Sequence, residues 1–463
     1  MVERVEPTGA VRAVGPRDLI FSTTDGRGVI TSANQGFARI AAHRWSDLMG
    51  APHNIIRHPQ MPAGAFKLMW DTLQAGQPFA AYVQNLAGDG AAYWVFATVT
   101  PLDDGYLSVR IAPGVDAYWS AAAGAYADVL VAERQARAEG LGGVAVAEVG
   151  CARLADRIGQ LGFADAEEFM HTVMPAEVLA MAERRRPVDP AEQADGPVGV
   201  VLSTCVAVDR EVAGLMERLD GLHGLAEQLQ QVERDALAAV AALGEVTELA
   251  QHASATVSQT APVLLSTAGA MSTLGDEVGG MLAELAPELA AARRAVLRVR
   301  FRIALARLHV DAVVDAAREI DRGSVQLGPE HLAQLCTSLR DDLAGARQGL
   351  EDGAAVLRRV GLGLELAHVR LRRTDRFLAT WRVQVPRYQV SRQLAPYVSP
   401  IDGRLRMSHE QLTALRDLAE RCAAEAEPFD DAALRALVDR VAAAAGGLSL
   451  SGVPPLSTAG GLP

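Results

Sequence analysis

Two different patterns of apolar residues meet near residue 116 of the chain. Before this point the β-prone runs DLIFSTTD and GVITSA flank Asp25-Gly26-Arg27-Gly28, which predicts a hairpin. The runs FAAYVQN, AAYWVFATVTPL and GYLSVRIAP predict three more strands. Between the two groups, PAGAFKLMWDTLQAG has apolar residues at helical spacing, so we expect one helix from near Pro62 to Gly76. The predicted order is two strands, helices and three strands.

After residue 116 the pattern predicts helices almost throughout. Steps of four and three residues separate an apolar series, which is typical of a coiled coil or a long helical bundle. Its members are Leu215, Leu219, Leu222, Ala226 and Leu229, then Val232, Ala236, Ala239, Leu243, Val246 and Ala250. We expect Pro262 and Pro287 to break or kink these helices. Asp402-Gly403 predicts a turn, and Pro428 predicts the start of the last helix.

These patterns divide the chain into seven expected segments. A mixed domain occupies residues 17–115 and a coiled-coil output region occupies residues 206–390. The other segments are a flexible tail (1–16), a helical connector (116–190), a linker (191–205), shorter helices (391–445) and a disordered tail (446–463). The linker is expected because residues 187–199 are rich in Pro and Gly.

Charge and cysteine content narrow the function classes. The formal net charge of −12 disfavours non-specific nucleic-acid binding, which depends on clustered Lys and Arg. The four cysteines are widely separated and have no zinc-ligand spacing, so we expect reduced thiols and no metal site. No signal peptide or membrane-spanning run is found, which predicts a cytoplasmic protein.

The segment from Gly50 to Trp70, GAPHNIIRHPQMPAGAFKLMW, is the most distinctive string of the chain. Together with TDGRGVITSAN before it and AAYWVFATVTPL after it, it resembles the PAS domain of bacterial aerotaxis receptors over about residues 18–113. The resemblance implies an α+β PAS fold, a five-stranded antiparallel sheet with short helices around a pocket, followed by an all-α output region. It also implies a signal-transduction sensor that is not an enzyme.

Members of the aerotaxis-receptor family often bind FAD in the PAS pocket and report redox state through it. Others bind haem, or no known ligand. The resemblance implies five cofactor-binding residues, which are Asn34, Arg57, His58, Trp70 and Asn85. It implies that Arg57 pairs with a phosphate of the cofactor and that His58 forms a hydrogen bond to the cofactor. The two asparagines would bind the polar edges of the cofactor ring. The chain departs from the family at Gln60, where Asp is usual, and at Phe79, where Trp is common.

Structural interpretations of the same residues stay open beside the functional ones. Asn34 directly follows a predicted strand and is suited to cap the next helix. Trp70 at helical spacing is also typical of a core residue. Tyr93 and Trp94 must face opposite sides of their strand, one toward the pocket or core and the other toward a partner surface. His53 precedes the short-helix region in which haem-binding relatives place an axial ligand, and a haem-ligand role for His53 is the minority interpretation.

The helical region carries the expected output. In aerotaxis receptors a long antiparallel coiled-coil hairpin binds the adaptor and kinase of the chemotaxis array. Here only Ile303–Glu319 weakly resembles the tip of that hairpin, so the output region is interpreted as a degenerate chemoreceptor-like one. We expect self-association through helices, a chemotaxis-type adaptor and kinase or another protein as partner, and no nucleic acid. The alternative is a cofactor-free PAS module for protein–protein interaction or scaffolding.

Overall fold

The computed structural model describes residues 5–184, 196–324 and 327–426, together with 432, 436, 439, 440 and 443. The described residues fall into two compact units. The first takes those of Met1–Met216, Arg300–Arg347 and Asp430–Pro463, and the second those of Glu217–Val299 and Gln348–Phe429. No helix in the described ranges is both long and apolar enough to cross a bilayer.

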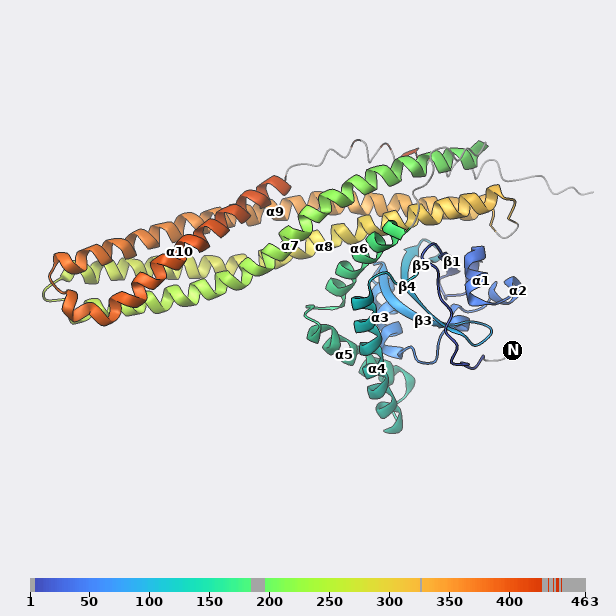
Figure 1. The fold of residues 1–463 in the computed structure, drawn as a ribbon, viewed down its shortest axis with the longest axis horizontal. Helices are drawn as coiled ribbons and strands as arrows, with labels where there is room; N and C mark the ends of the chain where they lie inside the picture. The colour runs from blue at the N-terminus through green and yellow to red at the C-terminus, as the bar shows by residue number, and fades with distance from the viewer. Residues whose placement is uncertain are drawn as a thin grey trace, which may run out of the picture. The chain divides into compact units, whose positions relative to one another are not determined.

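A five-stranded antiparallel sheet forms the centre of the first unit (Figure 1). Its spatial order is β2-β1-β5-β4-β3. The strands are β1 (Leu19–Asp25), β2 (Ile30–Ala33), β3 (Phe79–Leu86), β4 (Ala92–Leu102) and β5 (Gly105–Ile111). The three short helices between β2 and α3 are α1 (Gln35–Ala41), α2 (Trp45–Leu48) and the 3₁₀ helix η1 (His53–Ile56), and α3 spans Ala63–Gln74. The predicted hairpin, helix and three later strands are confirmed.

The two faces of the sheet have different partners because side chains alternate along each strand. On the inner face Tyr93 is buried in an apolar cluster with Phe37 of α1 and Ile56 of η1. Trp94, its neighbour, lies on the outer face and contacts Trp119 and Tyr126 of α4. The opposite orientations expected for Tyr93 and Trp94 are therefore confirmed.

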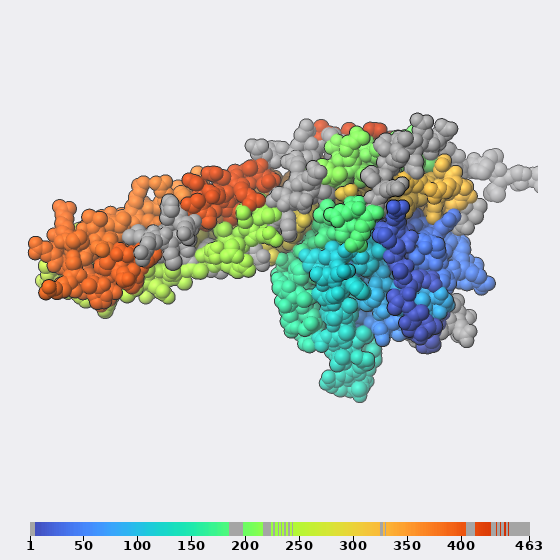
Figure 2. Space-filling view, viewed as in Figure 1, coloured from blue at the N-terminus to red at the C-terminus, as the bar shows by residue number. Residues whose placement is uncertain are grey.

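Three connector helices cover the outer face of the sheet and the side of α3. They are α4 (Asp116–Ala138), α5 (Gly143–Gln160) and α6 (Ala166–Arg184). Their apolar side chains form one cluster with Met61 and Ala65, near the start of α3. Figure 2 shows these helices, in cyan to green, as one continuous surface.

Four long helices account for most of the remaining described residues. They are α7 (Gly196–Thr256), α8 (Pro262–Asp321), α9 (Pro329–Arg387) and α10 (Ser391–Glu425). In the second unit α8 and α9 are antiparallel, since Glu277 pairs with Arg370 and Glu288 with Arg359. Of the predicted seam, Leu215, Leu229, Val246 and Ala250 are buried. The side chains of Leu219, Leu222, Ala226, Ala236, Ala239 and Leu243 lie outside the described residues.

Several local expectations differ from the structure. The expected tail is attached to the sheet, because Thr8 and Arg12 bond the backbone of Gly90 and Ala92 beside the turn before β4. Of the expected linker, residues 196–205 are helical and 191–195 lie outside the described residues. The local sequence of both segments predicts no regular structure. Backbone pairing and helix packing with residues distant in the sequence order these two segments.

The expected breaks in the long helices are confirmed at one proline only. Pro262 begins α8 after the end of α7, whereas α8 continues through Pro287. The turn predicted at Asp402-Gly403 is wrong, because α10 runs through it. Buried Leu394, Ile401 and Leu415 on α10 supply the packing that outweighs the local turn preference. Pro428 and residues 446–463 lie outside the described residues.

Candidate ligand-binding site

A cavity of about 250 Å³ lies between the inner face of the sheet, η1 and α3. Alternate residues of the strands form its floor, among them Val83 and Asn85 of β3 and Tyr106, Ser108 and Arg110 of β5. Helix α3 forms the opposite wall with Phe66, Met69, Trp70 and Leu73. Ligand pockets usually measure ~300–1,000 Å³, so this cavity has room for a ring system and not for a whole dinucleotide.

Three of the five residues predicted from the sequence line this cavity, namely Arg57, Trp70 and Asn85. Arg57 and Asn85 form an isolated backbone bridge, which holds η1 beside β3. The guanidinium of Arg57 stacks 3.9 Å from the ring centre of Phe66 and donates to the carbonyl of Met61. Arg57 is exposed, so its charged group lies at the mouth of the cavity, where it can meet the charged part of a ligand.

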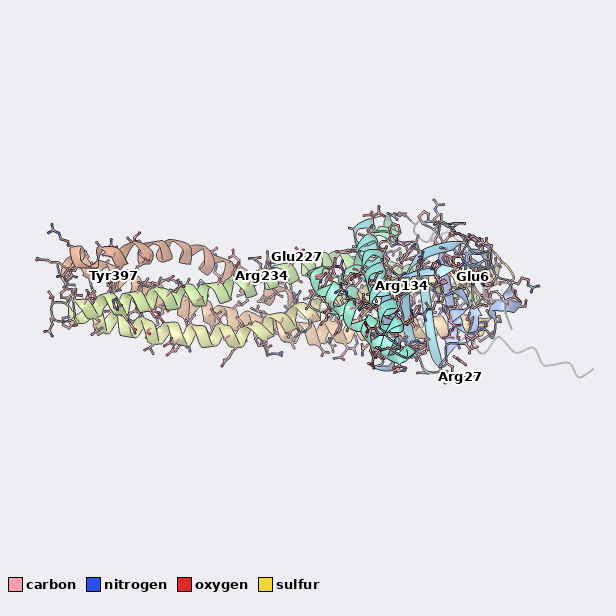
Figure 3. All side chains as sticks on the ribbon, turned by 90° about the horizontal axis from the view of Figure 1, so that it is seen from below. Glu6, Arg27, Arg134, Glu227, Arg234 and Tyr397 are labelled. Atoms are coloured by element: carbon pink, nitrogen blue, oxygen red, sulfur yellow. The ribbon has the colours of Figure 1, made fainter. Side chains whose placement is uncertain are left out.

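Trp70 spans the mouth from the α3 side. Its ring meets Tyr106 of β5 edge-on, with 5.4 Å between the ring centres. The β1–β2 turn approaches the same ring at Gly28, where a Cβ would lie 3.6 Å from Trp70 and where the backbone has φ +77°. Arg27, on this turn, is exposed (Figure 3). Trp70 is thus both a packing residue and a wall of the cavity.

Asn34 and His58 are not among the residues that line the cavity. The side chain of Asn34 caps α1 by accepting from the N–H of Phe37, accepts a second bond from Phe21, and donates to the carbonyl of Leu19. His58 is buried and accepts from the N–H of Gln60 in the turn before α3. Burial lowers the pKa of His58. Both side chains order the backbone around the cavity.

Two further residues, His53 and Arg110, also line the cavity. Arg110 of β5 is buried and donates to the hydroxyl of Ser22 and to Nε2 of His53. Because a guanidinium only donates, Nε2 of His53 is an acceptor and the imidazole is neutral. Burial, with the charge of Arg110 as second cause, holds the pKa of His53 well below its usual value.

Comparison with known proteins agrees with this architecture. Residues 30–111 match the family described as the PAS fold. The chain contains a PAS domain. Its PAS segment is 41% identical over 96 residues to the aerotaxis receptor of Escherichia coli (strain K12), which is 20% of this chain and 19% of that protein. It is 33% identical over 84 residues to a nitrogen fixation regulatory protein of Klebsiella pneumoniae, 18% of this chain and 17% of that one.

A third relative is the biofilm dispersion protein BdlA of Pseudomonas aeruginosa, 29% identical over 87 residues, 18% of this chain and 20% of that protein. The chain therefore matches about a fifth of the length of each of these relatives. Among solved structures, a light-oxygen-voltage domain is matched over 22% of this chain and 81% of that domain, at 22% identity and with a TM-score of 0.20.

Two buried donors of the PAS cavity lack a hydrogen-bond partner in the part of the chain that is described. They are Nη1 of Arg110 and Nδ2 of Asn85, on residues that are 3% and 4% exposed. A buried donor without an acceptor is costly, and native proteins seldom keep one without a reason. The remaining walls are largely apolar, with Ile56, Leu73 and Val99 among them. Apolar walls with two donors fit a flat aromatic ring that has acceptors along one edge, which is the chemistry of a flavin ring.

The PAS cavity offers no evident metal centre. No group of three or more His, Cys, Asp or Glu side chains suited to a metal ion occurs within the described ranges. Nε2 of His53 already accepts a bond from a cationic guanidinium. A positive neighbour at that atom opposes a second positive centre there, so the arrangement does not suit His53 as an axial ligand to haem iron.

The helix that walls the cavity is held by the connector. The buried carboxylate of Glu133, on α4, accepts from the N–H of Ala63 at 3.0 Å and of Gly64 at 2.8 Å, the first two residues of α3. These are backbone donors without partners inside the helix, and a negative charge there is favourable. Helix α5 crosses α3 at the same point, because a Cβ on Gly64 would lie 2.2 Å from the carbonyl carbon of Gly150.

The sequence signal for the missed residues was weak. Arg110 lies in the predicted strand GYLSVRIAP, and no motif in the sequence gives it a role. Its period-two position with Tyr106 and Ser108 could have placed it on the cavity face. Glu133 lies in an Ala-rich helix among other charged residues, and nothing in its surroundings distinguishes it from a solvent-exposed glutamate.

Proposed function

We propose that this protein is a signal-transduction sensor in which the PAS cavity holds the flavin ring of FAD. The ring would occupy the cavity between α3 and the sheet, with Asn85 and Arg110 at its acceptor edge. The phosphate-bearing remainder of FAD would extend out of the cavity through its mouth beside Arg57, whose guanidinium suits a phosphate. When bound, the flavin supplies redox chemistry that no side chain of the cavity can supply.

The observation that carries this proposal is the double role of α3. Its residues Phe66, Met69 and Trp70 line the cavity, while its first turn is held by Glu133 of α4. A change in the hydrogen bonds or charge at the ring edge would therefore act on a helix that is fixed to the connector. Packed helices pass on small shifts because their contacts leave little free space. The connector leads along the chain to α7.

We further propose that the long helices carry the output and self-associate. Leu362, Leu366 and Val369 of α9 follow one another at helical spacing and are 68%, 47% and 57% exposed. An exposed apolar stripe of this kind is typical of an interface. A relative named as an aerotaxis receptor supports a chemotaxis-type adaptor and kinase as the partner of this output. The residues at the two departures, Gln60 and Phe79, are not among those that line the cavity.

An absorption spectrum of the purified full-length chain, before and after incubation with FAD, tests the proposal. Flavin bands are expected, and they should remain in Glu133→Gln while the response of the connector to reduction is lost. The response is measured as the change in amide exchange of residues 116–160 between the oxidised and reduced states. Glu139→Gln, at the exposed end of α4, is the matched control and should respond as the parent does.

A colourless chain that takes up neither FAD nor haemin would contradict the sensor proposal and favour a cofactor-free interaction module. A Soret band would identify the bound cofactor as haem instead of flavin. Bound FAD with an unchanged connector in the parent protein would keep the ligand and refute the route through α3.

A further inference from the structure

Arg110 is a buried cation without a carboxylate beside it. It is 3% exposed, and among the described residues no acidic side chain forms an ion pair with it. Its contacts are the hydroxyl of Ser22, the neutral ring of His53 and the face of Phe37, 5.2 Å from the ring centre. None of these groups carries a compensating negative charge. Burying an uncompensated charge is strongly unfavourable.

The neighbours of Arg110 keep it accessible to a ligand. His53 stacks on Phe37 with 6.0 Å between the ring centres and 16° between the planes, and this pair supports the guanidinium from one side. Nη2 is used by Ser22 and His53, whereas Nη1 has no acceptor among the described residues. Because Arg110 lines the cavity, an occupant of the cavity is placed to supply the group that compensates its charge.

We propose that Arg110 is the specificity-determining residue of the PAS cavity, selecting a planar ligand whose acceptor edge carries negative charge or gains it on reduction. Nδ2 of Asn85, the second unpartnered buried donor, would bind a neighbouring acceptor of the same ligand. This inference deepens the proposed function and rests on it for the identity of the ligand as a flavin. It assigns to Arg110 the charge discrimination, which the resemblance to aerotaxis receptors left to other residues.

The buried charge of Arg110 is also present in the ligand-free protein. Burial lowers the pKa of Arg110 to about 10, so the guanidinium stays charged at neutral pH without a countercharge. Replacing an uncompensated buried charge by an apolar side chain of similar length often raises stability. A residue kept for binding at the expense of folding is typical of a functional site.

The test compares Arg110→Met, Arg110→Lys and the parent chain, each full-length, with and without FAD as the probe. Arg134→Met, which removes the charge of an exposed residue on α4, is the control for net charge (Figure 3). Three quantities are measured: the melting temperature of the ligand-free protein, the affinity for FAD, and the midpoint potential of the bound flavin.

For Arg110→Met we expect an unchanged or higher melting temperature without ligand, at least a tenfold loss of FAD affinity, and a more negative midpoint potential of whatever flavin still binds. Arg110→Lys should keep part of the affinity and most of the potential, since it keeps the charge. Arg134→Met should match the parent in all three quantities.

Equal FAD affinity and potential in Arg110→Met and the parent would overturn the inference. A clearly lower melting temperature of ligand-free Arg110→Met would also overturn it, because Arg110 would then be a structural residue. Failure of the parent to bind FAD refutes the flavin in the proposed function, and the inference on Arg110 is then decided by the ligand-free melting temperatures alone.

Discussion

The hydroxyl of Tyr82 donates to the carboxylate of Glu177 at 2.5 Å, joining β3 of the PAS domain to α6 of the connector. Glu177 is fully buried and also accepts from the N–H of Gly114 and Val115, where β5 leads into α4. Burial first, and then the bond to Glu177, raise the pKa of Tyr82, so the phenol stays protonated. One carboxylate therefore connects the sheet, the start of α4 and α6.

We expect Glu177→Gln to weaken the docking of the connector. An amide cannot accept three donors as a carboxylate does, and hydrogen bonds to a charged group contribute ~1.5–3 kcal/mol each. The free energy of unfolding should fall by about 2 kcal/mol in urea titrations followed by tryptophan fluorescence. Glu183→Gln, an exposed residue on the same helix, should leave it unchanged. An unfolding curve for Glu177→Gln identical to that of the parent would contradict this role.

The crossing of α3 and α5 has no room for a methyl group at Gly64. In Gly64→Ala the new Cβ would meet the backbone of Gly150, which cannot move as a flexible side chain can. Overpacking of this kind costs about 1–3 kcal/mol, and we expect a loss of that size together with faster amide exchange at the start of α3. Gly124→Ala on α4, where a Cβ meets nothing within 4 Å, should be neutral or stabilising by up to about 1 kcal/mol. Similar effects of the two substitutions would refute the close crossing.

The PAS domain should lose stability as the pH falls below about 6.5. Burial lowers the pKa of His53 and of His58 in the folded state, so the unfolded chain binds more protons in this range. The stability that neutral His53 contributes is present above the unfolded pKa and decreases as the pH falls toward the folded one. Thermal melts of the parent and of His53→Gln between pH 5 and 8 should show a weaker pH dependence in the variant. Parallel profiles would show that His53 does not titrate on unfolding.

The apolar stripe on α9 should mediate self-association. Replacing Leu362 and Val369 together by Glu places two charges on the exposed face and is expected to shift the chain toward the monomer in sedimentation velocity. The absorption spectrum of the PAS domain should not change. Val144→Glu, an equally exposed apolar residue on α5, is the control and should leave the oligomeric state as it is. A monomeric parent chain would refute self-association outright.

The order of strands and helices along the chain and the extent of α3 were accessible from the sequence because they depend on local patterns. Alternation, turn residues and the Pro62–Gly76 punctuation were sufficient for them. Local reasoning failed at Asp402-Gly403, where packing of α10 overrode a turn preference, and at residues 8–12, which pair with a turn some eighty positions away. Of the residues predicted from the resemblance, Arg57, Trp70 and Asn85 line one cavity, whereas the polar atoms of Asn34 and His58 bond the backbone nearby.

The sequence by itself determined that a PAS domain precedes a long helical region, because the strands, the turns and the PHNIIRHP string are local features of the chain. Only the tertiary structure decided which charges are buried. Arg110, Glu133 and Glu177 resemble ordinary surface charges in the sequence, and folding removes each of them from water. Burial depends on which distant segments pack over a residue, and it is burial that turns these three side chains into a ligand anchor and two links to the connector.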